Sequence, residues 1–484
     1  MSSQALVPPV NGGDTLQPQP RNVVFLFDGT GDKVDADVTN VVQLCKMLYN
    51  NALEKKENES KPDPSSEDMD DPRQIVFYRR GIGTWRPATK RRMIPLYGYV
   101  SQTVDKAIAW NFEDHVIDAY TALTHNYKEG DKICLFGFSR GAYTARAVAA
   151  VLGFFGILPP DSRDPQVFHK IKEIYFRASR SFSDHPELIK QFYTDLDEFC
   201  KTYKTIPITI EFLGVWDTVK SVGLFRTTGA MYSSSNPHVK TLRHAIALDE
   251  RRARFDRSMW RYNPKYKTDI EQVWFSGVHC DVGGGSVPNG TKPNLANIPL
   301  RWMIRECFKT NSGIVFKSNG LEEYGIDPTS LYPVVQARPK ALPLREDSIV
   351  QTPDSVKNNA VWAMKANTEE EHDHNDALAP LYDMLTINWQ VWNPLEIVPV
   401  KKWNEAKGEE VTEANWWAGR KIDIVASDGS RAKGFDGQIK VHRTVKMRMM
   451  AKSMDKNGSY VPAATLEMGG KKFNLDSEEI VWVD

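Results

Sequence analysis

The sequence predicts an α/β fold in which a mostly parallel central sheet is flanked by helices. Short apolar runs alternate with longer stretches that carry apolar residues at helical spacing, which is the order of a parallel sheet. Two of these runs end in glycine turns, at residues 28–31 and 137–141, as buried strands often do. The chain has 484 residues, more than one compact domain needs, so we also expect insertions and a C-terminal extension.

The predicted elements follow one another over the first 310 residues. Five apolar runs are the predicted strands: residues 22–27, 74–78, 132–136, 208–216 and 272–278. Four stretches are the predicted helices: residues 40–49, after Thr39 as the N-cap, and residues 100–127, 141–155 and 239–254. Because parallel strands share one carboxyl edge, polar residues that follow these strands are expected to meet there.

Composition divides the chain into a core and an extension. The predicted core, residues 21–310, contains a charged flexible loop at 54–71 and an insertion at 217–270. Glycines, serines and an apolar pair at 227–237 suit a lid over a site in the core. Residues 311–484 are predicted to form a C-terminal extension packed on that core.

Bulk composition excludes several classes of protein. Lysine plus arginine equals aspartate plus glutamate, at 62 each, so no net charge favours nucleic acid as a partner. Five widely spaced cysteines without a CxxC pair argue against a disulfide framework and for a reducing compartment. Residues 1–20, expected to be a disordered N-terminus, lack the features of a secretory signal, and no apolar run reaches the ~18 residues of a spanning helix. We therefore expect a cytoplasmic location, with export by a route that reads no cleaved signal left open.

One glycine turn carries a candidate nucleophile. The sequence GFSRG at residues 137–141 matches the G-x-S-x-G pattern, with Ser139 at its centre. Glycines let the backbone turn sharply from strand to helix there, so that the serine is exposed at the sheet edge. An apolar run precedes the pattern and an alanine-rich stretch follows it, which favours this interpretation over a serine that only caps a helix. The fold expected is therefore that of the α/β-hydrolases.

Candidate partners for Ser139 follow two later strands. Asp217 comes directly after one predicted strand and His279 after the next, so both are expected at the edge that carries the serine. A histidine base oriented by a carboxylate is what a serine nucleophile requires. Asp281, two residues beyond His279, is an alternative carboxylate for orienting it.

Six segments together resemble a known family. They are FDGT (27–30), TNV (39–41), YRRGIGT (78–84), GFSRGA (137–142), GVWDTV (214–219) and GVHCDVGGG (277–285). In this order they resemble the α/β-hydrolase domain family catalogued as domain of unknown function 2235 (DUF2235), which includes phospholipase effectors of bacterial type VI secretion. The resemblance covers about residues 21–302, and the chain looks like a fungal-type member.

The resemblance implies a mechanism. The family's triad carries over onto Ser139, Asp217 and His279, and it implies hydrolysis of a carboxylic ester, in a lipid, a phospholipid or a small molecule, through an acyl-enzyme. No metal or other cofactor is required. The expected oxyanion donors are the N–H groups of Arg140 and of the turn at residues 28–30, where Gly29 and Thr30 supply donors and Asp28 supports them.

Two motifs offer rival chemistries. FDGT at 27–30 also matches part of the DxDGT motif of haloacid-dehalogenase-type phosphatases, but the nucleophilic aspartate is replaced by Leu26, which cannot accept a phosphoryl group. The segment HDHND at 372–376 would place two imidazoles on one face if it were a strand and so hold a metal. Its acidic, breaker-rich context favours a solvated loop instead.

His442 is the main competitor for the role of base. It lies in a strand-like segment at 439–445, and His279 is preferred because only His279 ends a strand in the predicted sheet order. His442 remains a possible supporting residue.

Other roles for the chain stay open. The thirteen tryptophans, including Trp416 and Trp417, raise the alternative of transient contact with a membrane surface, although aromatic side chains are mostly core residues. A catalytically silent binding module is disfavoured because no triad member is missing. Acyl transfer by the same triad is an alternative to hydrolysis.

Overall fold

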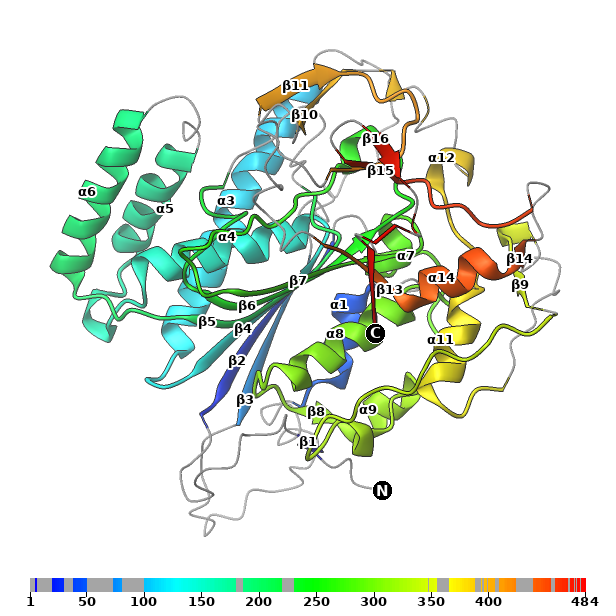
Figure 1. Ribbon diagram of the computed structural model, residues 1–484. Helices are drawn as coiled ribbons and strands as arrows, with labels where there is room; N and C mark the ends of the chain where they lie inside the picture. Colours follow the sequence, from blue (N-terminus) through cyan, green and yellow to red (C-terminus); the bar gives the residue numbers. More distant parts are fainter. Residues whose placement is uncertain are drawn as a thin grey trace, which may run out of the picture.

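Eight strands form the central sheet of the computed structural model (Figure 1). In chain order they are β2 (Asn22–Phe27), β3 (Gln74–Arg79), β4 (Lys132–Phe138), β5 (Ile210–Trp216), β6 (Val239–Ala247), β7 (Asp269–Phe275), β13 (Ile439–His442) and β17 (Ile480–Val483). Across the sheet the order is β17-β13-β7-β6-β5-β4-β2-β3, and every neighbouring pair is parallel. The predicted α/β fold with a mostly parallel sheet is therefore confirmed.

The structure describes residues 5–6, 20–29, 38–49, 73–80, 100–179, 186–219, 230–346, 348–354, 365–387, 393, 396–397, 399–404, 409–423, 438–453, 458–468, 471–473, 475, 477–478 and 480–484. The predicted loop at 54–71 lies outside these residues, as does most of the segment 1–20. From that segment, β1 (Ala5–Leu6) pairs with β8 (Phe316–Lys317).

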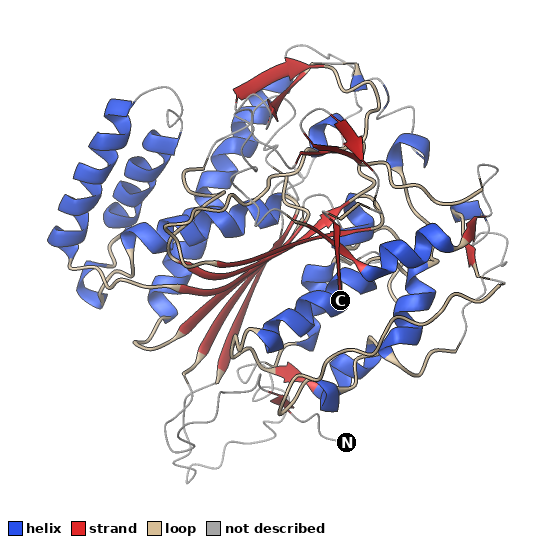
Figure 2. Cartoon of the chain, viewed as in Figure 1, coloured by secondary structure: helices blue, strands red, loops and turns tan. Residues whose placement is uncertain are grey.

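Helices cover both faces of the sheet (Figure 2). One layer contains α3 (Val100–Asn126), α4 (Arg140–Phe155), α5 (Pro165–Ser179) and α6 (Pro186–Tyr203), and the other contains α1 (Asn40–Met47), α7 (His279–Gly283), α8 (Asn297–Lys309) and α9 (Ser318–Glu323). Alternate residues of a strand serve the two layers: Val23 and Phe25 pack in the first core, and Val24 and Leu26 in the second. The strands are thus buried on both sides, as parallel sheets require.

Helix α1 begins as the sequence predicts. Thr39 is its N-cap, and the Thr39 side chain accepts a hydrogen bond from the N–H of Val42.

The prediction of a helix at 239–254 is wrong, because this segment contains strand β6, which lies between β5 and β7 in the sheet. Eight of the nine residues of β6 are buried, so its apolar positions do not alternate, and a buried run of this kind resembles a helix in sequence. The segment 217–270 is therefore not only an insertion, since it contributes a central strand.

The described part of the predicted lid is fixed to the helical layer. The N–H of Ala230 donates to the Tyr143 hydroxyl at 2.6 Å, and the N–H of Met231 donates to Ser179 Oγ at 3.1 Å. The Tyr175 hydroxyl donates to the Met231 carbonyl at 2.8 Å. Residues 227–229 of the predicted lid lie outside the described part of the chain.

The C-terminal part of the chain completes the sheet and covers one side of it. Strand β13 pairs with β7, and β17 pairs with β13. The other elements after residue 310 are β9 (Ile349–Val350), α11 (Glu369–Ala377), α12 (Met384–Ile387), β10 (Val400–Asn404), β11 (Glu409–Glu413), β12 (Lys421–Asp423), α14 (Arg443–Met450), β14 (Lys452–Ser453), β15 (Thr465–Met468) and β16 (Lys471–Phe473). The boundary at residue 310 stays a prediction. Among the described helices, none combines the length and the hydropathy needed to cross a membrane.

The acidic segment at 369–376 is helix α11 and not a solvated loop, so that prediction is wrong. Thr368 caps the helix, and the carboxylates of Asp373 and Asp376 are buried. Arg301 of α8 donates to Asp373 at 2.7 Å and to Asp376 at 2.7 Å. Arg305 pairs with Glu369, and Arg338 pairs with Glu370 and also with Asp373. Arginines from distant segments thus neutralise a charge pattern that by itself suggests solvent exposure.

We expect Arg301→Met to destabilise the fold strongly, because the buried Asp376 carboxylate loses its arginine and the buried Asp373 carboxylate keeps only Arg338 of the two arginines that pair with it. Removing one partner of a buried pair typically costs about 3–5 kcal/mol. Denaturant unfolding of the variant measures the loss. Lys201→Met, which breaks the exposed Lys201–Asp197 pair, is the matched control and should change the free energy of unfolding by less than about 1 kcal/mol. Equal losses in the two variants would contradict the role of Arg301.

Candidate active site

Ser139 lies on a sharp turn between β4 and α4. Its backbone has φ 59° and ψ −124°, in the region that non-glycine residues rarely adopt. The N–H of Ser139 donates to the Trp216 carbonyl at 3.1 Å, which ties this turn to the end of the neighbouring strand β5. Strained backbone of this kind persists only where the surrounding structure enforces it, and it is frequent at functional sites.

The two glycines of the motif are required by close packing. A Cβ atom on Gly141 would lie 2.2 Å from the Phe27 carbonyl oxygen, and one on Gly137 would lie 2.6 Å from the Gly141 carbonyl oxygen. Real Cβ atoms do not approach backbone this closely, so β2, β4 and α4 can meet at this point only with glycine at both positions.

The structure brings Ser139, His279 and Asp217 together. His279 Nε2 lies 2.7 Å from Ser139 Oγ, and His279 Nδ1 lies 2.6 Å from Asp217 Oδ2. Asp217 follows β5 directly, and His279 is the first residue of α7, which begins after β7. All three side chains are buried. One imidazole therefore connects a hydroxyl to a carboxylate, with hydrogen-bond distances on both sides.

A fourth residue, Arg420, completes this group. Arg420 Nη1 donates to Asp217 Oδ1 at 2.6 Å, and Arg420 Nη2 donates to Asp217 Oδ2 at 2.9 Å. The N–H of Ala247 also donates to Asp217 Oδ1, at 3.0 Å. Every oxygen of this buried carboxylate is thus paired. Arg420 is not predictable from the sequence, because no local motif marks an arginine 203 positions from its partner.

The imidazole is held by packing as well as by hydrogen bonds. The His279 ring packs against Phe138, with ring centroids 4.6 Å apart, and against Phe255, with centroids 4.9 Å apart. The backbone N–H of His279 donates to Glu250 Oε2 at 3.2 Å, and Glu250 is itself paired with Arg252. These contacts restrict rotation of the ring away from Ser139.

Burial and charge act in opposite directions on the pKa values of the pair. Burial lowers the pKa of His279 below its ordinary value, although the hydrogen bond and the charge of Asp217 oppose this shift. Burial alone would raise the pKa of Asp217, but the Arg420 charge and the hydrogen bonds from His279 and Arg420 hold it below its usual range. A neutral imidazole beside an ionised carboxylate is the state that can accept a proton from Ser139 Oγ.

The predicted oxyanion donors have different surroundings. Arg140 is the first residue of α4, and its N–H belongs to the first turn, where helical N–H groups have no partner within the helix. The N–H of Gly29 donates to Asp28 Oδ1 at 2.7 Å. Asp28 also accepts from Thr39 Oγ1 at 2.6 Å and from the Tyr78 hydroxyl at 2.5 Å, so it ties β2, α1 and β3 together. Thr30 lies outside the described residues.

His442 does end a strand of the same sheet, so one reason for preferring His279 is wrong. His442 is the last residue of β13, and its Nδ1 lies 2.8 Å from Thr444 Oγ1 at the start of α14. Burial lowers the pKa of His442 to about 3. Its ring stacks on Phe275 with centroids 5.0 Å apart. His442 thus has partners of its own, and it is His279 that contacts Ser139.

Asp281 does not take the place of Asp217 beside His279. Asp281 Oδ2 accepts from the N–H of Val278 and from the N–H of Tyr382, each at 3.1 Å, and Oδ1 accepts from Ser286 Oγ at 2.8 Å. It therefore braces the first turn of α7.

The proposed metal site at 372–376 is not formed as the sequence suggested. In helix α11 the side chains of His372 and His374, two residues apart, point to different sides, so the strand geometry that would pair them is absent. Among the described residues, no group of three or more His, Cys, Asp or Glu side chains is arranged to hold a metal ion.

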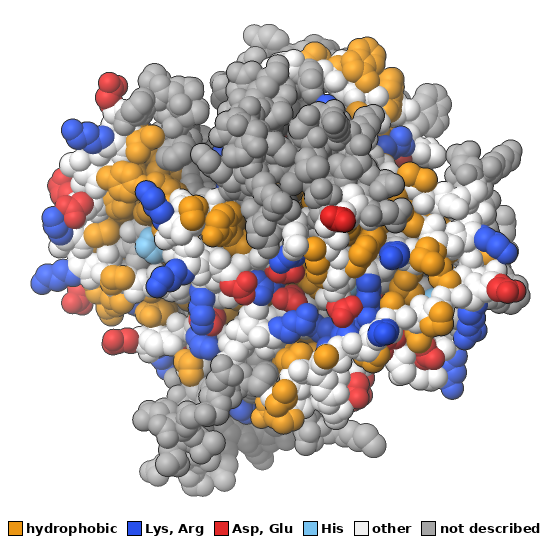
Figure 3. Space-filling view, in the orientation of Figure 1, with side chains coloured by type: hydrophobic (Ala, Val, Ile, Leu, Met, Phe, Trp, Pro, Cys, Tyr) orange, Lys and Arg blue, Asp and Glu red, His pale blue; other side chains and the backbone are white. Residues whose placement is uncertain are grey.

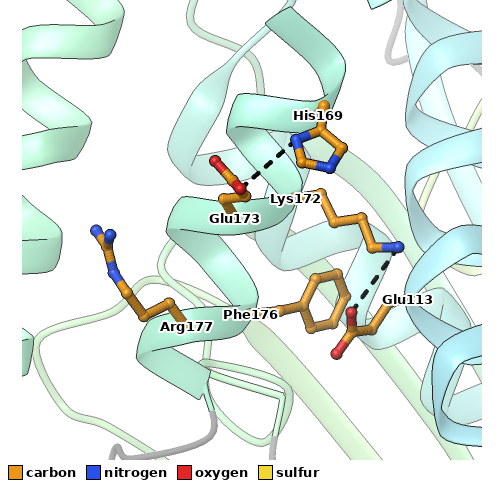
Figure 4. Close-up of a pocket in the computed structure, with 6 residues that line it drawn as sticks. All are labelled: Glu113, His169, Lys172, Glu173, Phe176 and Arg177. Carbon is orange, nitrogen blue, oxygen red and sulfur yellow. Dashed lines mark ion pairs between the residues drawn. The ribbon is translucent and has the colours of Figure 1, made fainter. Parts of the chain in front are cut away.

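A cavity of about 430 Å³ opens between α3 and α5 (Figure 4). Its lining consists of Glu113, His169, Lys172, Glu173, Phe176 and Arg177. Two ion pairs line it: His169–Glu173 at 3.7 Å lies within α5, and Lys172–Glu113 at 3.9 Å joins α5 to α3. The cavity shares no residue with the Ser139 group, and its charges neutralise one another, so it offers no counterpart to the buried serine, histidine and aspartate.

Comparison with known proteins identifies relatives of the chain. Residues 21–306, more than half of the chain, match the family described as "T6SS, Phospholipase effector Tle1-like, catalytic domain". An uncharacterised protein of Saccharomyces cerevisiae, YEL023C, is 28% identical, with 64% of this chain and 60% of the yeast protein covered. The chain thus spans less than two thirds of that relative.

Two solved structures are also similar. A crystal structure of an uncharacterised protein from Pseudomonas aeruginosa has 18% identity and a TM-score of 0.34, with 74% of this chain and 53% of that chain covered. The structure of the Tle1 effector bound to the VgrG spike of the type 6 secretion system has 17% identity and a TM-score of 0.27, with 60% and 58% covered.

We expect activity to fall on the acid side as His279 becomes protonated, with a midpoint below 6.5, the ordinary pKa of histidine, because burial lowers this pKa. Arg420→Met removes a positive charge from the Asp217 carboxylate. The carboxylate then stabilises the imidazolium more strongly, so the midpoint should move to higher pH. The pH profile of kcat/KM measures this.

Arg420→Lys is the control for this measurement, since it keeps the charge and should shift the midpoint less than Arg420→Met. If Arg420 were only structural, Arg420→Met would lower the rate at every pH and leave the midpoint in place.

Proposed function

The chain belongs to the family of Tle1-like phospholipase effector catalytic domains, and from this membership and the site geometry we propose that it is a serine hydrolase of lipid esters. The family supports ester hydrolysis in general. The observation that carries the specific proposal is the position of His279, whose two ring nitrogens lie 2.7 Å from Ser139 Oγ and 2.6 Å from Asp217 Oδ2. This is the arrangement by which serine hydrolases activate their nucleophile.

In the first step, Ser139 Oγ attacks the ester carbonyl while His279 Nε2 accepts the hydroxyl proton. His279 Nδ1–H donates to Asp217 throughout, which fixes the tautomer and stabilises the imidazolium. The imidazolium then protonates the leaving alcohol, and an acyl group remains on Ser139. In the second step, water attacks the acyl carbon while His279 accepts a proton from it. The bond to Ser139 Oγ then breaks, the imidazolium returns the proton to Oγ, and the carboxylic acid is released.

The tetrahedral intermediate needs donors for its oxyanion. The N–H of Arg140 is suited to this role, because it belongs to the free N–H groups at the start of α4, where the helix dipole also favours negative charge. The Gly29 amide is close, since a Cβ built on Gly29 would lie 3.7 Å from Ser139 Cβ. For it to act as the second donor, its hydrogen bond to Asp28 has to open when substrate binds.

The surroundings of the serine favour an apolar acyl chain. Ser139 is 5% exposed and contacts His279, whose ring packs against the two apolar rings of Phe138 and Phe255. Hydrocarbon next to the ester carbonyl can pack against apolar rings of this kind, whereas a polar group there would lose its hydrogen bonds to water. We therefore assign the substrate to the lipid esters, with a phospholipid as the class that the family name suggests.

A fluorophosphonate probe should label the wild-type protein at Ser139, because His279 makes the hydroxyl nucleophilic. Ser139→Ala should remain unlabelled and should lose hydrolysis of both p-nitrophenyl esters and phospholipid vesicles. Peptide mapping after labelling identifies the modified residue. Equal labelling of the wild type and Ser139→Ala would refute the nucleophile, whereas ester transfer to an added alcohol would redefine the reaction as acyl transfer.

His279→Ala should lower kcat by roughly 10⁴-fold, the typical effect of removing a triad member. His442→Ala is the matched control, since His442 also ends a strand of the sheet but contacts Thr444. That variant should change stability more than kcat. Steady-state kinetics on a soluble ester, with thermal unfolding of both variants, separates the two histidines. A larger fall of kcat in His442→Ala would overturn the assignment of the base.

A further inference from the structure

Four large apolar side chains gather on the surface near the segment that carries Arg420. Trp416 is 65% exposed and Trp417 is 39% exposed. Ile397 is 51% exposed and follows Glu396, whose carbonyl accepts from the N–H of Trp416 at 3.4 Å. Val461 is 79% exposed on the segment leading into β15, which pairs with β12 directly after Arg420. Figure 3 shows hydrophobic side chains at its upper right edge, where Figure 1 draws the chain after β11.

The two tryptophans occupy the centre of a strained turn. The N–H of Ala418 donates to the Asn415 carbonyl at 3.0 Å, which closes a four-residue turn. Trp416 has φ 50° and Trp417 has φ 59°, so both central residues are in the left-handed region. Turns with positive φ at both central positions are dominated by glycine, asparagine and aspartate. Two tryptophans at these positions therefore do not stabilise the turn, and the exposure of their apolar rings to water is also unfavourable.

Buried contacts connect this turn to the catalytic group. Asn415 Nδ2 donates to Glu396 Oε2 at 2.7 Å, and Glu396 Oε1 accepts from the N–H of Ala253 at 2.8 Å. Two residues further, Phe255 packs against the His279 ring, and its carbonyl accepts from Arg420 Nη2 at 2.5 Å. Arg420 thus ties one side of the turn to Asp217, and Asn415 ties the other side, through Glu396, to the segment that carries Phe255.

We propose that the Trp416–Trp417 turn is a lipid-surface contact that docks the bilayer beside Ser139. The proposal rests on the proposed function, since a lipid ester has to reach the triad from a membrane. Tryptophan is suited to the interface, because its ring is apolar and its N–H polar. A stable protein interface buries ~800 Å² per partner. Two indoles bury at most ~150–250 Å² each, so insertion into lipid fits the size of this surface better.

The contact is apolar in character. The chain has 62 basic and 62 acidic residues, so net charge does not draw it to anionic lipid. Binding to vesicles of phosphatidylcholine alone should therefore be measurable and should depend little on salt concentration.

The test uses the full chain with Ser139→Ala, so that binding is measured without hydrolysis. Trp416→Asn with Trp417→Gly removes both indoles and introduces the residues that this turn prefers. This gain offsets the loss of the exposed hydrogen bond from Trp417 Nε1 to Asn393 Oδ1, so thermal stability should change little. Cosedimentation with phosphatidylcholine vesicles should weaken at least ~10-fold, equal to about 1.4 kcal/mol. The double variant Trp416→Phe with Trp417→Phe should retain most of the binding.

Tyr262→Asn is the matched control, because this aromatic residue is 45% exposed and lies outside the turn. With Ser139 restored, the ratio of the vesicle rate to the soluble-ester rate should fall at least ~10-fold in the Asn-Gly variant. Unchanged vesicle binding, or an equal loss in Tyr262→Asn, overturns the proposal. Absence of all ester hydrolysis in the wild type would instead overturn the proposed function, since cosedimentation does not depend on catalysis.

Discussion

The carboxylate of Asp217 is the constraint on which the site depends. It is fully buried, and an ionised carboxylate in such a place is tolerated only when its oxygens are paired. Its donors come from three places: the imidazole of His279, the guanidinium of Arg420 and the backbone N–H of Ala247. Each donor also has a fixed place in the fold. The charge therefore holds together α7, the end of β6 and the segment before β12.

The parallel sheet makes this convergence possible. Strands β4, β5 and β6 are neighbours and all end at one edge, so Ser139, Asp217 and Ala247 arrive there without any long loop. The C-terminal residues then add β13 and β17 beyond β7 and supply Arg420. Residues after the matched family segment 21–306 thus take part in the centre of the site.

Local patterns predicted much of the fold and of the site. The strand, glycine turn and alanine-rich helix around Ser139 depend on neighbours in sequence, and so does the position of Asp217 after β5. Strand β6 was missed because a central strand buried on both faces has no alternation. The acidic sequence of helix α11 favours a loop, because the arginines that neutralise its acids are far away in sequence.

Dependence on residues far away in sequence also explains why two features of the site were not predicted: the pairing of Arg420 with Asp217, and the position of His442 at the end of a strand of the central sheet. A guanidinium that pairs with a carboxylate 203 positions away leaves no local signal. Likewise β13 joins β7 only through tertiary structure, so the sequence could not reveal that His442 ends a strand of the same sheet that leads to His279. The two histidines differ in their hydrogen-bond partners. His442 is buried and contacts the Thr444 hydroxyl, whereas His279 contacts the Asp217 carboxylate. Only the second arrangement would stabilise the imidazolium that the proposed proton transfer from Ser139 creates, and strand position alone could not have selected it.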